Sequence, residues 1–91
     1  MEITWTEGSL ERLEEIGCFI AADSPSRASR FVDMLIEAVE RLHDFPLSGS
    51  LCPENPVFRQ VVVEGYRIVY RVREKLVEII TVISPGLQAK L

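Results

Sequence analysis

The stretch that decides the fold is residues 57–83, VFRQVVVEGYRIVYRVREKLVEIITVI, in which almost every second residue is apolar. Two polar pairs interrupt the alternation, Glu64-Gly65 and Glu74-Lys75, and each has the length and polarity of a β-hairpin turn. The stretch therefore predicts three antiparallel strands joined as a meander. Everything else in the chain has to pack on this sheet.

The two faces of the predicted sheet differ, because successive side chains of a strand point to opposite sides. In the middle strand one face is apolar and is expected to be core: Tyr66, Ile68, Tyr70 and Val72. The opposite face is mostly basic: Arg67, Val69, Arg71 and Arg73. The last strand is apolar on both faces, which is typical of a strand covered on both sides: Leu76, Val77, Ile79, Ile80, Val82 and Ile83. Something must cover its second face.

The residues before the sheet predict a short strand followed by a helical hairpin. Residues 2–6 are rich in β-branched and aromatic side chains, and Thr6 can cap a helix. The first helix carries an apolar stripe at a spacing of three and four: Leu10, Leu13, Ile16, Gly17, Ile20 and Ala21. Ser24-Pro25 is a helix start signal, and a second stripe follows it: Ala28, Phe31, Val32, Leu35, Ile36, Val39 and Leu42. Pro46 ends this helix near residues 43–45.

Two irregular segments complete the chain. Residues 46–56, PLSGSLCPENP, contain three of the five prolines and are expected to form a surface connection pinned by Leu47 and Leu51. Ser84-Pro85-Gly86 stops the last strand, and the remaining LQAKL is too short to fold alone. The predicted fold class is α+β, with residues 1–91 forming a single domain of N-terminal strand, helical hairpin and three-stranded antiparallel meander.

The charge of the chain is divided between its halves, although the net charge of the 91 residues is -4. Residues 1–56 carry 4 Lys/Arg and 11 Asp/Glu, a net charge of -7, whereas residues 57–91 carry 6 and 3, a net charge of +3. The overall sign argues against direct DNA binding, and the local sign favours an acidic partner over the sheet. No apolar run approaches the roughly 20 residues of a membrane helix, and no signal peptide is evident, so a cytoplasmic protein without membrane contact is expected.

Two phrases, ERLEEIGCFIAADSPSRASRFVDMLIEAVERLHDFPLSG and FRQVVVEGYRIVYRV, resemble the ParE/RelE superfamily of bacterial type II toxin–antitoxin toxins. The resemblance covers nearly the whole chain and is closer to the ParE branch. Its most specific parts are A-x-x-F at Ala28 and Phe31, L-x-x-F-P-x-x-G over residues 42–49, Arg59, and G-Y-R-I-V-Y-R over residues 65–71. ParE-like chains usually leave the last strand through a histidine followed closely by an arginine, whereas this chain has Ser84-Pro85-Gly86.

The residues give no support for catalysis, a cofactor or a metal site. His43 is the only histidine, and its place near a helix C-terminus is favourable for a positive charge. Together with Cys18 and Cys52 it would supply three scattered ligands without metal-binding spacing, and we assign no disulfide to the two cysteines. Tyr66, Tyr70 and Trp5 are expected to be core aromatics. No catalytic residue is therefore predicted.

Partner binding is the chemistry that the sequence favours. Guanidinium groups recognise oxyanions bidentately, and the predicted partner-binding residues are Arg59, Arg67, Arg71, Arg73, Ile80 and Val82. The alternative is a solvated strand face with Arg67 and Arg71 paired to acids on neighbouring strands. Both interpretations remain open on the sequence alone.

The resemblance implies a plasmid-stabilisation type of toxin that binds and inhibits a target such as DNA gyrase. It also implies neutralisation by a ParD-like antitoxin with an acidic and apolar C-terminal segment, and it is compatible with a toxin homodimer within that complex. Two alternatives remain: a RelE-like ribosome-dependent mRNA endonuclease, and a non-toxic relic that only binds antitoxin. A ParE-like toxin would be a non-catalytic inhibitor, whereas a RelE-like endonuclease would be an enzyme.

Overall fold

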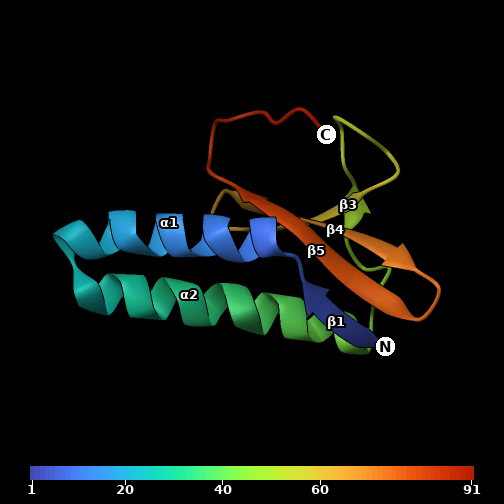
Figure 1. Ribbon diagram of the computed structural model, residues 1–91, viewed down its shortest axis with the longest axis horizontal. Coiled ribbons are helices and arrows are strands. Elements are labelled where there is room, and N and C mark those ends of the chain that lie inside the picture. Colours follow the sequence, from blue (N-terminus) through green and yellow to red (C-terminus); the bar gives the residue numbers. More distant parts are fainter.

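A computed structural model describes all residues from 1 to 91 and gives the α+β fold that the sequence predicts. An N-terminal strand is followed by two helices and then by the strands of the meander (Figure 1). The elements are β1 (Glu2–Trp5), α1 (Glu7–Asp23), α2 (Pro25–Glu40), the short 3-10 helix η1 (Arg41–His43), β2 (Ser50–Leu51), β3 (Arg59–Val63), β4 (Tyr66–Arg73) and β5 (Leu76–Ile83). Neither α-helix is both long enough and apolar enough to cross a lipid bilayer.

The sheet has five strands in the order β1-β5-β4-β3-β2. The predicted meander β3-β4-β5 is confirmed, and its first turn uses Glu64 and Gly65 at φ 49° and 83°. Positive φ at both central residues is the conformation that joins two twisted strands through a two-residue turn. β1 pairs with β5 in parallel, from Glu2 opposite Leu76 to Trp5 opposite Ile79. The short β2 lies within the loop that the sequence predicts to be irregular.

Both helices begin at the capping residues expected from the sequence. The Thr6 hydroxyl accepts a hydrogen bond from the Ser9 backbone N–H at 3.1 Å, and it also donates to the Ile79 carbonyl at 2.8 Å. Ser24 accepts from the Arg27 N–H at 3.3 Å, with Pro25 in the first turn of α2. Each cap satisfies a backbone donor that the first helical turn leaves free. The Thr6 cap also ties the start of α1 to the sheet.

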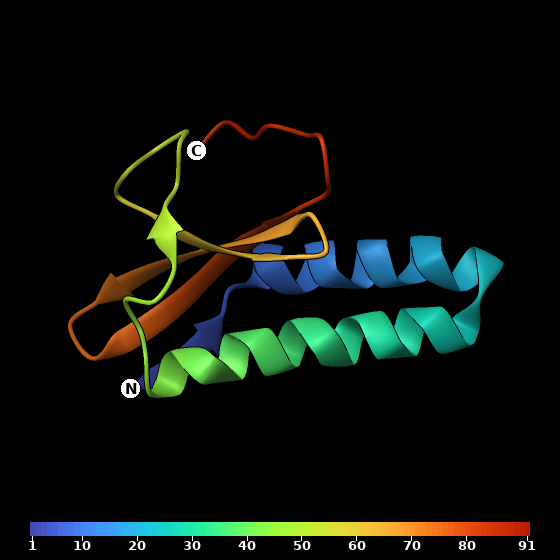
Figure 2. The ribbon, with the colours of Figure 1, turned by 180° about the vertical axis from the view of Figure 1, so that it is seen from behind.

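The main core lies between the helical hairpin and one face of the sheet. Its largest fully buried side chains come from both layers: Tyr70, Leu35, Leu42, Ile68 and Ile79. Phe31 of α2 packs its ring 4.5 Å from that of Tyr66, centroid to centroid. The end of the hairpin where α1 meets α2 extends beyond the sheet (Figure 2), so part of its apolar surface lies outside this core.

The second face of the sheet is covered by the chain itself. Residues after β5 arc back over the side of the sheet away from the helices (Figures 1 and 2). A small buried cluster forms there from Cys52, Val69 and Ile83, packed against Phe58, Ile80, Ala89 and Leu91. A β-bulge leaves Ile80 without a partner on β4, between the pairs Tyr70–Ile79 and Val69–Thr81. The apolar second face of β5 is therefore satisfied within the monomer.

The loop of residues 46–56 is pinned, but the prediction that Leu47 and Leu51 pin it is wrong. These side chains are 61% and 56% exposed. Instead, the Gly49 N–H donates to the Tyr70 hydroxyl at 2.9 Å, and Cys52 is 1% exposed in the second cluster. The loop is held by the hydrogen bond of Gly49 and the burial of Cys52, whereas Leu51 lies on the edge strand β2, where little covers its side chain.

Candidate functional site

The strand register places the predicted partner-binding residues in two separate groups. Arg67, Arg71 and Arg73 share the outer face of the sheet with Ile80, and we call this surface the arginine face. Arg59 is opposite Tyr70, and therefore lies on the helix-facing side of the sheet. Val82 is 0% exposed in the main core. The folded chain therefore presents none of Val82 to a partner and separates Arg59 from the other arginines.

Arg59 binds the loop of its own chain. Its guanidinium donates to the Gly49 carbonyl at 2.8 Å and to the Leu47 carbonyl at 3.5 Å. These bonds hold the segment before β2 in place, and so they occupy donors that a partner would otherwise use. The contact gives Arg59 a structural role in the folded chain.

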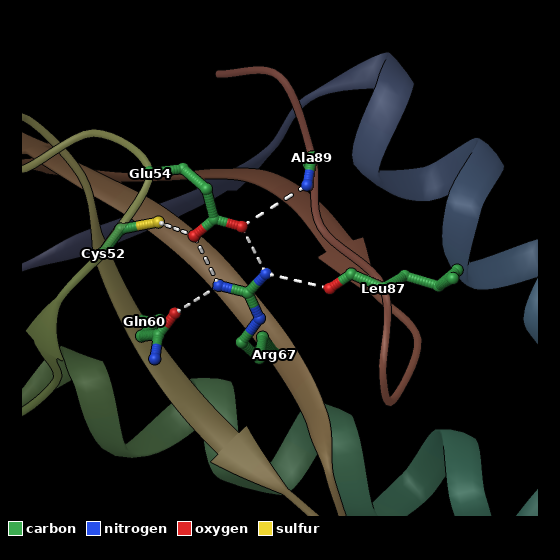
Figure 3. A network of polar contacts seen from close by, with 6 residues as sticks. All are labelled: Cys52, Glu54, Gln60, Arg67, Leu87 and Ala89. Atoms are coloured by element: carbon green, nitrogen blue, oxygen red, sulfur yellow. Dashed lines mark hydrogen bonds and ion pairs between the residues drawn. The ribbon is translucent and has the colours of Figure 1, made fainter.

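Arg67 forms a bidentate ion pair with Glu54 (Figure 3). The two side chains are only 17% and 18% exposed, and the nitrogen–oxygen distances are 2.7 and 2.5 Å. The guanidinium lowers the pKa of the Glu54 carboxyl from 4.5 to about 2, because it stabilises the charged form. Glu54 in turn raises the pKa of Arg67. The pair is charged throughout the physiological range.

The same pair fastens the C-terminal tail, residues 84–91, to the arginine face. Arg67 donates to the Leu87 carbonyl at 3.2 Å, and the Ala89 N–H donates to Glu54 at 3.4 Å (Figure 3). Gln60 of β3 accepts a further bond from Arg67 at 3.0 Å. Arg67 therefore joins a loop, two strands and the tail, and its charge is used inside the molecule.

The other end of the arginine face centres on Glu78 of β5. Arg71 lies directly opposite and approaches its carboxylate at 3.3 Å, while Arg73 lies 3.6 Å from the other oxygen. The three arginines of the face meet two carboxylates, Glu54 and Glu78, so the surface keeps one net positive charge. Arg73, with 59% of its side chain exposed, is the arginine best placed to meet a partner.

A second candidate surface is the hairpin seam, the open groove between α1 and α2. It encloses about 380 Å³ and is lined mainly by apolar or small side chains: Leu10, Leu13, Gly17 and Ala21 of α1 with Ala28 and Val32 of α2. Leu10 is 51% exposed there. The predicted apolar stripe of α1 is thus only partly used by the core, and the small residues leave room for another helix to approach closely.

The histidine and tyrosines considered for chemistry lie in different places. The His43 ring contacts Glu40 at 3.1 Å and the Met1 carbonyl at 2.6 Å, at the end of the second helix. Tyr70 is fully buried, and desolvation raises the pKa of its hydroxyl. Tyr66 packs on Phe31. Each of the three has a structural contact that accounts for its position.

Comparison with known proteins decides the family. The family model for the ParE toxin of type II toxin–antitoxin system, parDE, matches residues 3–86. The chain belongs to the ParE toxin family. It is 38% identical over 81 residues to "Putative toxin Y4kP" of Sinorhizobium fredii, covering 88% of this chain and 83% of that protein. The solved structure titled "Chromosomal ParDE TA system from P. aeruginosa" superimposes with a TM-score of 0.81 at 23% identity, covering 94% and 97% of the two chains, and so shares the fold.

Several residues of the motifs that carry the ParE resemblance have structural roles in this chain, whereas Phe45 of the same motifs is 67% exposed. Ala28, Phe31 and Leu42 are buried, at 8%, 6% and 1% exposure. A side chain at Gly49 would meet the Tyr70 hydroxyl and the Gln60 carbonyl, each at 2.6 Å, so this position has no space for a Cβ atom. The motif thus secures the crossing from α2 to the sheet.

Three features of the folded chain are not predicted by the sequence analysis: the role of Glu54, the residues of the tail that cover the sheet, and the exposure of Phe19. Glu54 lies in a proline-rich loop where nothing marks it as a partner of Arg67. In the tail, Ala89 and Leu91 are two residues apart and both pack against the second cluster, but Leu87 of the same alternation is 58% exposed, so the alternation alone does not identify the covering residues. Phe19 of α1 falls outside the apolar stripe and is 81% exposed. The exposure of a single aromatic side chain can be recognised only from the folded structure.

Proposed function

We propose that this ParE-family chain is the toxin of a type II toxin–antitoxin pair, that it acts by binding and inhibiting a large enzyme such as DNA gyrase, and that a ParD-like antitoxin neutralises it. The observation that carries the proposal is the hairpin seam, an apolar groove that the monomer leaves open. Soluble proteins commonly reserve such exposed apolar surface for a partner. An amphipathic helix is the occupant that a groove between two helices fits best.

The antitoxin segment is also expected to carry acidic residues that complement the positive charge of the toxin. α1 carries Glu11, Glu14 and Glu15, and Glu14 lines the seam itself, so an acidic segment would be repelled there. Arg73 and the residual charge of the arginine face offer one attractive position for such residues. We therefore infer that the apolar part of the segment lies on the seam and that its acidic part reaches the sheet.

A binding mechanism, rather than RNA cleavage, is supported by the places of the candidate acid–base groups. Cleavage needs a proton acceptor and a donor within hydrogen-bond reach of one phosphate. His43 contacts Met1 and Glu40, and Tyr70 has no exposed surface. The arginines can hold a phosphate, but at a pKa above about 12 they are poor bases. A relic that binds only the antitoxin is favoured by one observation, the Ser84-Pro85-Gly86 exit from β5.

To test this, the purified protein is added to gyrase with supercoiled plasmid. In parallel, it is added to translating ribosomes with a defined mRNA. We expect stabilised double-strand breaks in the plasmid and an intact mRNA. Cuts in the mRNA at fixed codon positions would refute the binding mechanism. Inactivity in both assays, with antitoxin binding retained, would favour the relic. The preformed toxin–antitoxin complex is the control and should be inactive in both.

A further inference from the structure

The outer edge of β3 is open over most of its length. β2 pairs with β3 only at Arg59 and Gln60, and no strand lies beside residues 61–63. This segment is Val61-Val62-Val63, three β-branched residues, with Val62 55% exposed. An apolar edge strand with unpaired backbone groups is a template for another strand.

The pairing pattern shows which backbone groups face that edge. The Cys52 N–H donates to the Phe58 carbonyl at 2.9 Å, so the main-chain groups of Phe58 point away from β4. In an antiparallel strand this orientation repeats at every second residue, and therefore includes Gln60 and Val62. Gln60 is already paired with Ser50 of β2. The N–H and C=O of Val62 are the pair left without a neighbouring strand.

A hollow begins where this edge ends. It encloses about 370 Å³ beyond Val63, and Glu64 is one of its lining residues. Its apolar wall includes Phe31, Met34 and Tyr66, and its rim carries Arg27 and Arg30 on successive turns of α2. Neither arginine takes part in an ion pair, although Asp23 and Glu64 also line the hollow. An incoming carboxylate would therefore find two unpaired guanidinium groups.

We propose that an extended segment of the antitoxin pairs with β3 at Val62 and continues past Glu64 into this hollow. There it places an apolar side chain on Phe31 and Tyr66 and a carboxylate between Arg27 and Arg30. The mode is the addition of a strand to a sheet edge, in which backbone bonds give affinity and alternate side chains give specificity. The proposal rests on the proposed function for the source of the segment.

A second copy of the chain fits this edge less well. Antiparallel pairing of two β3 strands centred on Val62 would set Glu64 of one copy opposite Gln60 of the other. The outward groups of Gln60 are already bonded to β2, so any incoming strand pairs only at Val62, and the choice of occupant depends on the hollow. The arginines of the hollow would then receive no carboxylate from the other copy's strand.

The first test follows the Val62 amide in the unaltered protein. The probe is a ParD-like antitoxin, the product of a small reading frame sought beside the gene, co-purified with the chain. Hydrogen exchange measured by NMR should be rapid at Val62 in the free protein and slowed by at least about tenfold in the complex. Equal exchange in a complex that does form would overturn the inference while leaving the proposed function intact. Absence of any complex would count against both.

The second test uses paired variants. Val62→Pro removes the outward N–H and leaves the bonds to β4 in place, whereas Val62→Thr keeps the N–H and the branched shape. We expect Val62→Pro to weaken the complex by about tenfold or more and Val62→Thr to leave it unchanged. Circular dichroism checks that both variants are folded. If Val62→Pro does not fold, the exchange of the Val62 amide in the wild-type protein tests the strand pairing instead.

The charge part of the inference has its own matched pair. Arg30→Glu reverses a charge at the hollow, and Arg41→Glu reverses an exposed, unpaired arginine just after the same helix. Arg30→Glu should weaken the complex by about tenfold, and Arg41→Glu should change it less than about twofold. Equal effects of the two variants would overturn the carboxylate site. Protection of Val62 in a dimer without the probe would show that a second copy is the occupant.

Discussion

At the scale of single residues, Gly49 is the position with the least freedom. Its N–H binds the buried Tyr70 hydroxyl, its carbonyl accepts from Arg59, and the Gln60 carbonyl approaches from the side. Three strands and loops of the chain, represented by Gly49, Gln60 and Tyr70, thus come together around the position where a Cβ atom of residue 49 would lie. The glycine is required by close approach, since Gly49 is not among the residues with positive φ.

Replacing Gly49 by alanine should lower the free energy of unfolding by about 1–3 kcal/mol, because the new methyl group overlaps backbone and hydroxyl atoms that are fixed from both sides. Chemical denaturation measures the change. Gly8→Ala is the matched control, since nothing lies within 4 Å of its added carbon and alanine is the better helix former. A Gly49→Ala protein as stable as the wild type would show that the loop moves freely.

Glu54 should make the stability of the chain depend on acid pH. Its pKa falls from 4.5 to about 2 in the folded state, so its contribution is complete above about pH 4.5 and is lost as the pH falls toward 2. Denaturation midpoints of the wild type and Glu54→Gln should therefore differ by a constant amount above that range and converge below it. Glu11→Gln, which removes an exposed carboxylate without an ion pair, should follow the wild type. A constant difference between the midpoints of the wild type and Glu54→Gln down to pH 2 would contradict the lowered pKa of Glu54.

At the scale of elements, the C-terminal tail covers part of the sheet face that the helices leave open. The helices cover one face, and residues 84–91 with the loop around Cys52 cover part of the other. The tail has no regular secondary structure, so its position depends on Arg67, Glu54 and a few apolar contacts. Five residues after Gly86 therefore complete the fold, although they cannot fold alone.

Deleting residues 87–91 should destabilise the chain by about 2 kcal/mol, since it returns parts of Val69 and Ile83 to water and removes two partners of the Glu54–Arg67 pair. The deleted form should also bind a hydrophobic dye more strongly. Lys90→Ala, which alters an exposed side chain of the same segment, should stay within about 0.5 kcal/mol of the wild type. Unchanged stability and dye binding after deletion would show that the tail does not protect this face.

The hairpin seam gives a prediction about the proposed antitoxin. Leu10→Glu places a charge in the apolar groove and should weaken the complex by more than about tenfold, because an apolar contact is lost and a charge is desolvated. Leu47→Glu changes a leucine of similar exposure outside the seam, and should leave binding unchanged. Calorimetric titration compares the two. Equal affinities would place the antitoxin elsewhere on the chain.

At the scale of the whole molecule, the charge division of the sequence is partly neutralised by folding. The basic half contributes the arginine face, but acids from both halves, Glu54 and Glu78, occupy it. Arg27 and Arg30, two cations of the acidic half without an ion pair, line the hollow beside the open edge of β3. The positive surface is therefore in a different place from the one that residue counts suggest.

A partner that binds only the folded chain should raise its thermal midpoint in proportion to the logarithm of partner concentration. Free antitoxin at about 100 times its Kd adds about 2.7 kcal/mol, which corresponds to about 10–20 °C for a chain of this size. Differential scanning calorimetry over a range of antitoxin concentrations measures the shift. A midpoint independent of that concentration would contradict binding to the native state.

The features that the sequence determined are those set by neighbouring residues. Thr6 and Ser24-Pro25 fix the helix starts, because a cap needs only a side chain two or three positions from a free N–H. Alternation in residues 57–83 fixes which side chains share a face, and Glu64-Gly65 fixes the first hairpin. The family resemblance follows from the same local phrases.

The tertiary structure alone decided which segments meet across long separations. Periodicity showed that β5 has two apolar faces, but it could not show that the tail and Cys52 cover the second one. The pairing of β1 with β5, of Glu54 with Arg67 and of Gly49 with Tyr70 joins residues whose local sequences carry no mark of each other. Local sequence fixes the pattern of each element, whereas the partner of each surface depends on how the whole chain closes around one core.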